Sequence, residues 1–140
     1  MKTSHSYVPS NFVIQELIPP TFFHKYGNNA IRYIDPRICD VLSVVRDWIG
    51  KPMTINNWHT GGQRSWSGLR TADSPHYRSG SAHSFGQAFD AVGDWDANLV
   101  RQAILDGELI LPHWVRLETN ITWLHVDVMA VQQKVETFKP

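Results

Sequence analysis

Two short segments of this chain hold residue types that bind a catalytic metal ion. Residues 81–90 read Ser-Ala-His-Ser-Phe-Gly-Gln-Ala-Phe-Asp and contain His83 and Asp90. Residues 123–127 read Trp-Leu-His-Val-Asp and contain His125. Two imidazole nitrogens, one carboxylate oxygen and a water molecule are a ligand set of catalytic zinc, whereas structural zinc sites use four protein ligands. The pattern therefore indicates a hydrolytic metal site.

The same segments match S-x-H-x-x-G-x-A-x-D and W-x-H-x-D. In this the chain resembles peptidase family M15, the zinc D-Ala-D-Ala carboxypeptidases and L-alanyl-D-glutamate endopeptidases, and it looks like a phage-type member. The zinc-bearing signalling domain of hedgehog proteins shares the fold of that family. The resemblance extends in order and spacing from about Asn56 to Val128. It implies one Zn²⁺ per chain, with His83, Asp90 and His125 as its ligands.

Hydrolysis also needs a carboxylate that takes a proton from the attacking water and passes it to the leaving amine. The family has an acidic residue three positions before the last histidine, where this chain has Thr122. Glu118 is the nearest upstream carboxylate. A hairpin closed by loop 119–122 pairs Glu118 with Trp123 and places it diagonally to His125 on the same face of the sheet. We therefore predict that Glu118 is the catalytic base, although a register shift of one residue would turn it to the other face.

Two further residues are candidates for the site. Arg70 stands where the family has its Gly-Tyr-Arg segment, which implies a guanidinium that clamps a substrate carboxylate or polarises the scissile carbonyl. Asp127 shares a face with His125, where it could orient that imidazole or instead bind backbone N–H groups of loop 59–84. Among the tryptophans, Trp66 is the one expected to line a cleft.

The elements that position these residues follow from periodicity and capping residues. Asp35 and Asp96 can each cap a helix, and glycines follow all three predicted helices. The long loop 59–84 is of a length that is usually functional. Helices and strands do not alternate regularly, so we expect one α+β domain over residues 1–140, with a largely antiparallel sheet and flanking helices. The predicted helices are 20–26, 35–50 and 96–107, and the predicted strands are 53–58, 88–92, 114–118 and 123–128.

Composition and charge limit the kinds of partner that this chain is expected to bind. The chain has 140 residues, 42% of them hydrophobic, which is enough for one core, and its formal net charge of 0 argues against nucleic-acid binding. No apolar stretch is long enough to insert into a membrane or to serve as a secretory signal. The single Cys39 excludes an intramolecular disulfide and reads as a buried, inert thiol.

The resemblance implies a substrate, the stem peptide of bacterial peptidoglycan. We expect a monomeric zinc metallopeptidase, made in the host cytoplasm without a signal peptide and acting on the cell wall as a phage endolysin. An L-alanyl-D-glutamate endopeptidase is favoured, with a D-Ala-D-Ala carboxypeptidase as the alternative. A virion component that opens the wall during entry would use the same chemistry. Because Thr122 replaces the acidic residue of the family, a protein of a different class remains an alternative: a non-catalytic zinc-containing module that binds wall peptide or a protein partner.

Overall fold

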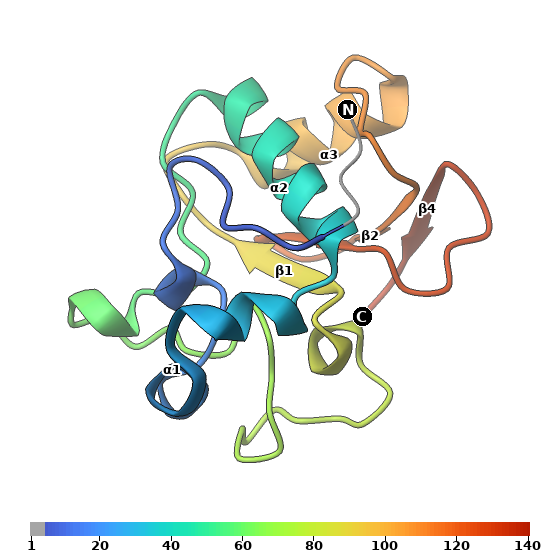
Figure 1. Ribbon diagram of the computed structural model, residues 1–140. Coiled ribbons are helices and arrows are strands. Elements are labelled where there is room, and N and C mark those ends of the chain that lie inside the picture. Colours follow the sequence, from blue (N-terminus) through green and yellow to red (C-terminus); the bar gives the residue numbers. More distant parts are fainter. Residues whose placement is uncertain (1–4) are drawn as a thin grey trace.

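Helices and strands follow one another without regular alternation in the computed structural model, which describes residues 5–140 (Figure 1). Within these residues the fold is α+β, as expected, with short 3₁₀ helices in the connections. The main elements are α1 (Pro20–Tyr26), α2 (Pro36–Ile49), β1 (Ala88–Ala91), α3 (Ala97–Asp106), β2 (Val115–Glu118), β3 (Leu124–Asp127) and β4 (Val135–Phe138).

The three predicted helices are confirmed, together with the residues that begin and end the longer two. The carboxylate of Asp35 accepts a hydrogen bond from the backbone N–H of Arg37, the second residue of α2, and Asp96 accepts one from Asn98, the second residue of α3. Gly50 and Gly107 follow these helices in the left-handed conformation, with φ of 69° and 78°. Local capping chemistry was therefore sufficient to locate both helices.

The sheet has the strand order β1-β3-β2-β4. β3 pairs antiparallel with β1 and with β2, whereas β4 pairs parallel with β2, so the sheet is mixed. Strand β4 was not expected from the sequence. Its prediction of a strand at 53–58 was wrong, because that segment makes only one isolated bridge, Thr54 to Val92. Beyond the bridge, the backbone N–H of Asn56 donates instead to the carbonyl of Glu16.

The two faces of the sheet differ in character because side chains alternate along each strand. One face carries apolar side chains, among them Leu117 and Val126, which are fully buried in one continuous cluster with apolar residues of α2 and α3. The other face carries Asp90, His125 and Asp127. The helices thus supply the core, while the opposite face of the sheet is left for polar side chains.

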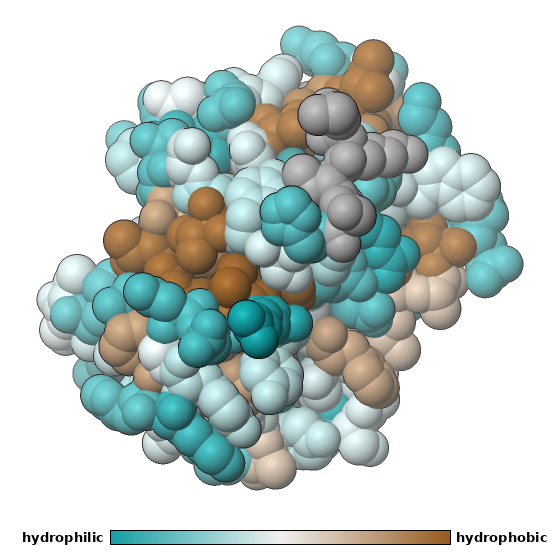
Figure 2. All heavy atoms as spheres, viewed as in Figure 1, coloured by the Kyte–Doolittle hydropathy of each residue, from teal (hydrophilic) through white to brown (hydrophobic). Residues whose placement is uncertain are grey.

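The outer surface seen in Figure 2 is mostly hydrophilic, with an apolar band left of the centre. Cys39 of α2 is buried, as expected, and burial raises the pKa of its thiol to about 11. Among residues 5–140 we find no helix with the length and apolar character needed to cross a membrane.

Candidate metal centre

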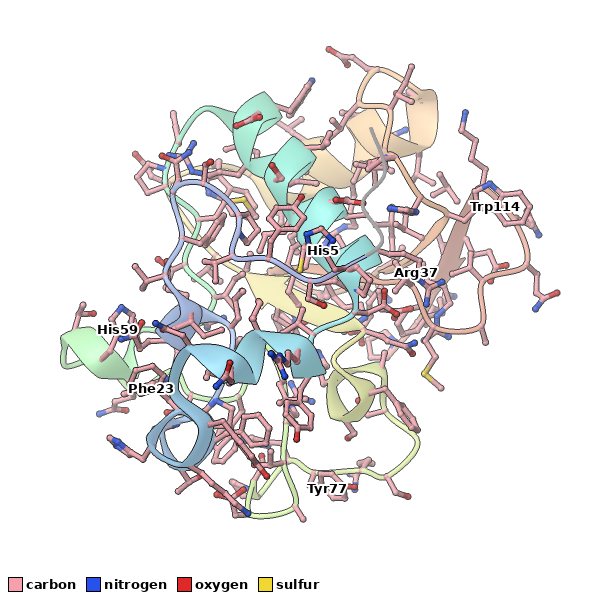
Figure 3. All side chains as sticks on the ribbon, viewed as in Figure 1. His5, Phe23, Arg37, His59, Tyr77 and Trp114 are labelled. Carbon is pink, nitrogen blue, oxygen red and sulfur yellow. The ribbon has the colours of Figure 1, made fainter. Side chains whose placement is uncertain are left out.

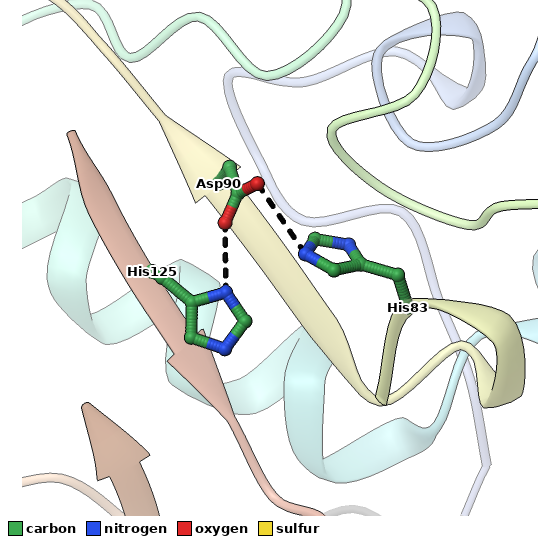
Figure 4. Close-up of side chains that lie close together, drawn as sticks. All are labelled: His83, Asp90 and His125. Carbon is green, nitrogen blue, oxygen red and sulfur yellow. Dashed lines mark hydrogen bonds and ion pairs between the residues drawn. The ribbon is translucent and has the colours of Figure 1, made fainter. Parts of the chain in front are cut away.

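Three buried side chains converge at the polar face of the sheet (Figure 4). His83 comes from the 3₁₀ helix η4 (Ala82–Phe85), Asp90 from β1 and His125 from β3, and one ligand atom of each lies within 4.8 Å of the others. Nε2 of His83 lies 3.3 Å from Oδ2 of Asp90, and Nδ1 of His125 lies 2.8 Å from Oδ1 of the same carboxylate. The structure thus brings together the three residues that the sequence motifs single out.

Local structure around His83 turns one ring nitrogen toward Asp90. The hydroxyl of Ser81 accepts a hydrogen bond from the backbone N–H of His83, and Gly86 ends the turn with a φ of 68°. The Nδ1 atom of His83 lies 2.9 Å from the carbonyl oxygen of Gly68. Because a carbonyl oxygen can only accept a hydrogen bond, Nδ1 carries the proton and Nε2 presents its lone pair to the cluster.

His125 lies between two carboxylates. Its Nδ1 faces Asp90, and its Nε2 lies 2.7 Å from Oδ2 of Asp127, whose side chain is fully buried. Burial lowers the pKa of His125, but the hydrogen bonds to Asp127 and Asp90 outweigh this effect and raise the pKa to about 9. Of the two contacts foreseen for Asp127, the structure contains the one with the imidazole. In the described part of the chain, no N–H of loop 59–84 is hydrogen-bonded to it.

Asp90 lies beside both imidazoles, accepts a hydrogen bond from Nδ1 of His125 and stays ionised. Burial by itself would raise its pKa, yet the hydrogen bond with His125 and the nearby His83 ring hold the pKa well below the usual value for an aspartate. A buried carboxylate that remains charged beside two imidazole nitrogens is suited to a cation.

The catalytic-base candidate Glu118 lies next to this cluster. Arg116 is paired with Asp127, whereas the predicted hairpin pairs it with His125, so the predicted register was wrong by two residues. An even shift preserves which side chains share a face. Continued by one residue, the observed register places Glu118 directly opposite His125, and its Oε1 lies 3.9 Å from Nδ1 of that ring.

The register has a physical cause in the turn between β2 and β3. The guanidinium of Arg101, a buried residue of α3, donates to the carbonyls of Trp123 at 2.6 Å and Ile121 at 2.9 Å. These bonds hold the chain at 119–123 outside the ladder, so Trp123 does not pair with Glu118. No local signal in the sequence indicates this clamp, because Arg101 is about twenty residues distant.

Arg70 reaches the same cluster from the long loop. Its Nε donates to the carbonyl of Trp66 at 2.7 Å, and its Nη2 lies 3.4 Å from Oδ2 of Asp90. The loop is fixed on both sides, since the backbone N–H of Arg70 donates to the carbonyl of His83 and that of Asp90 donates to Ser67. Arg70 thus combines a structural bond to a loop carbonyl with a guanidinium that faces the candidate site.

Two residues beside the centre were missed by the sequence analysis. Arg116 forms a bidentate ion pair with Asp127, at 2.7 and 3.0 Å, and its guanidinium lies 4.6 Å from the ring centre of Phe138. The Phe138 ring meets that of His125 edge to face at 5.5 Å. Phe138 belongs to β4, whose β-branched and aromatic residues are typical of a strand, but nothing in this segment predicts its partner β2.

A pocket of about 370 Å³ opens over the cluster. The tryptophan that lines it is Trp123 rather than Trp66. The remaining histidines do not join the cluster, and Figure 3 shows two of them, His5 and His59, well apart from each other on the surface. The residues lining the pocket are Arg70, Gly80, Ser81, Ala82, His83, Asp90, Arg116, Glu118, Trp123, His125, Asp127 and Phe138.

The donor set fits a zinc ion. Ligands about 2.0–2.1 Å from a tetrahedral metal lie roughly 3.3 Å from one another. Nε2 of His83 and Oδ2 of Asp90 have this spacing, whereas Nδ1 of His125 and Oδ1 of Asp90, at 2.8 Å, are at hydrogen-bond distance and would have to separate slightly around an ion. The second nitrogen of each imidazole is hydrogen-bonded to a carbonyl or a carboxylate, as is usual for metal-binding histidines. Three protein ligands beside an open pocket leave a position for a reacting molecule.

No family model matches this chain, and no significant match was found among curated proteins or solved structures. The resemblance to family M15 therefore rests on the two sequence motifs.

Proposed function

We propose that this chain is a zinc metallopeptidase that hydrolyses peptide bonds in the stem peptide of bacterial peptidoglycan. The observation that carries the proposal is the convergence of His83, Asp90 and His125, with Glu118 and Arg70 in the same pocket. The peptide substrate is supported by the resemblance of the two motifs to family M15. We favour an L-alanyl-D-glutamate endopeptidase that acts as a phage endolysin.

When bound, zinc would lower the pKa of a water molecule and polarise a carbonyl group. His83, Asp90 and His125 would hold the ion, and Asp127 fixes the orientation of the His125 ring through Nε2. Arg116 in turn fixes Asp127 by two parallel hydrogen bonds. The chain therefore supplies both the ligands and the contacts that keep them in place.

Glu118 is the residue placed to move the proton. Hydrolysis forms a bond between the water oxygen and the carbonyl carbon and breaks the carbon–nitrogen bond, and a proton must reach the leaving nitrogen. The Glu118 carboxylate lines the pocket beside His125, where it can take the proton from water and return it to the amine. Arg70 also lines this pocket, where it can donate to a substrate carbonyl or carboxylate.

The alternative of a non-catalytic zinc module depends on the absence of a carboxylate near the metal ligands. Thr122 lines a neighbouring pocket and not the pocket over the triad. Glu118, however, reaches within 3.9 Å of a ligand nitrogen. This proximity favours the enzyme over the binding module.

Digestion of purified peptidoglycan by the zinc-loaded protein tests the proposal. Mass spectrometry of the products should show new N-terminal D-Glu, whereas release of free D-Ala would indicate the carboxypeptidase. His83→Ala should abolish cleavage and zinc binding, and His59→Ala, at an exposed histidine outside the triad, should leave both intact. Removing zinc with a chelator should abolish cleavage reversibly. Tight binding of one zinc ion per chain without any cleavage would support the binding module instead.

A further inference from the structure

A second pocket adjoins the one over the metal-ligand triad. It also measures about 370 Å³, and Asp90 and Trp123 line both pockets. The second pocket lies between loop residues 64–67, the turn before β3 and the end of β1. A molecule lying across Asp90 would thus contact both pockets. The residues that line the second pocket are Arg64, Ser67, Asp90, Val92, Thr122 and Trp123.

The guanidinium of Arg64 is fixed at the wall of this second pocket. Its Nε donates to the carbonyl of Ile55 at 2.8 Å, and its Nη2 donates to the hydroxyl of Ser67 at 3.0 Å. The backbone N–H of Arg64 also donates to the side-chain oxygen of Asn57 at 2.9 Å. A half-buried arginine whose guanidinium is held by two hydrogen bonds has already lost most of its rotamer freedom, so binding a ligand costs little further entropy.

The charge of Arg64 has no partner within the described residues. None of the ion pairs between residues 5 and 140 includes Arg64, and its Nη1 makes no hydrogen bond there. Arg70 differs, because its Nη2 lies 3.4 Å from Asp90 and its charge is directed at the triad. The guanidinium groups of Arg64 and Arg70, which belong to one loop, therefore line two different pockets.

Carboxylates are the ligands best matched to such a group. A guanidinium offers parallel N–H donors in a plane, and a carboxylate accepts two of them at once. The exposed indole of Trp123 and the hydroxyl of Thr122 line the same space, which suits a peptide rather than a bare ion. A phosphate group is less favoured than a carboxylate, because it carries more negative charge and is repelled more strongly by Asp90, which lines the same pocket.

We propose that the Arg64 pocket is a second subsite of the enzyme and binds a carboxylate of the peptide on the Arg64 side of the scissile bond. The proposal rests on the peptidase function given above. The carboxylate has two possible sources, an acidic residue within the peptide or the carboxyl terminus of the peptide. In the first case the substrate continues past the triad in both directions, as an endopeptidase requires. In the second case it ends in the Arg64 pocket, as a carboxypeptidase requires.

Four synthetic stem peptides distinguish these sources. One carries both carboxylates, one has the internal carboxylate converted to an amide, one has the terminal carboxylate converted to an amide, and one has both converted. For wild-type protein we expect kcat/KM to fall at least about tenfold when the recognised carboxylate is converted. In Arg64→Gln the ratio of kcat/KM for the acid to kcat/KM for the amide should be below about twofold. The control Arg32→Gln changes an exposed arginine of the 3₁₀ helix at Gly27–Tyr33 and should retain the wild-type ratio.

Arg64→Lys covers the case in which Arg64→Gln fails to fold, as judged by circular dichroism and zinc content. Lysine keeps the charge but lacks the planar fork, so the acid-to-amide ratio should fall to an intermediate value. If amidation has no effect, or if the ratio is unchanged in both Arg64 variants, the subsite is refuted and the peptidase function stands. If zinc-loaded wild type cleaves none of the peptides, the peptidase function fails. The subsite is then tested by calorimetric binding of the same four peptides. It is supported only if wild type binds the carboxylate peptide more tightly than its amide and Arg64→Lys weakens this preference.

Discussion

Replacing Glu118 with glutamine tests the proposed proton transfer most directly. The amide retains the size of the side chain and its position opposite His125, but it cannot accept a proton at neutral pH. Because the carboxylate approaches Nδ1 of His125 only to 3.9 Å, while Asp90 approaches it to 2.8 Å, Glu118 is not expected to be a metal ligand. We therefore expect the zinc content of Glu118→Gln to remain at one ion per chain.

The expected loss is in the rate of peptide hydrolysis. General acid–base groups contribute about 10²–10⁴-fold to such reactions, which corresponds to roughly 3–5 kcal/mol in the activation free energy. The assay is kcat/KM for a synthetic stem peptide, followed by chromatography and mass spectrometry. Glu136→Gln is a matched control, since Glu136 lies on the neighbouring strand β4 but does not line the pocket. A zinc-loaded Glu118→Gln variant within about threefold of wild type would refute the assignment of the base, since proton transfer would then not depend on Glu118.

Three further outcomes are expected. Arg116→Met should leave the fully buried carboxylate of Asp127 with fewer partners. The free energy of unfolding in urea should therefore fall by about 2–4 kcal/mol and the zinc affinity by about 10–100-fold. A free energy of unfolding within about 0.5 kcal/mol of wild type would contradict this. Gly86→Ala should weaken zinc binding and lower the free energy of unfolding by at least about 1–3 kcal/mol. The reason is that a Cβ at this φ of 68° would lie 1.9 Å from the carbonyl oxygen of Tyr33. An unchanged thermal unfolding temperature would argue against that contact. The buried thiol of Cys39, with its pKa raised to about 11, should react with a thiol reagent only at the rate of unfolding, and rapid labelling of the folded protein at pH 8 would contradict its burial.

The metal-ligand candidates were accessible from the sequence because each belongs to a short pattern with a local role. Ser81 and Gly86 form the turn around His83, and four residues later the alternation of β1 turns Asp90 to the polar face. His125 lies in a strand whose period of two is visible in its neighbours. Such features depend on a few consecutive residues, whose backbone preferences are largely independent of the rest of the chain.

Glu118 illustrates what a local pattern can and cannot predict. Its face was predicted correctly, because the alternation of a strand is intrinsic to the backbone. Its partner was predicted wrongly, because the register is set by contacts made across the molecule: Arg101 holds the turn, and Arg116 pairs with Asp127. These contacts favour the observed pairing over one displaced by two residues, which would keep the same faces.

The pairing of β4 with β2 and the positions of Arg64 and Arg116 were decided by tertiary structure alone. β4 pairs with β2, but no hairpin connects the two strands, so no turn sequence predicts the pairing that places Phe138 beside His125. Arg64 is one of several charged or polar residues in a long loop until Ile55 and Ser67 fix its guanidinium beside the second pocket. Periodicity and capping are local and can be recognised in the chain itself. Strand partners, ion pairs and pocket walls depend on which distant segments gain most free energy by packing together, and only the folded molecule shows the result.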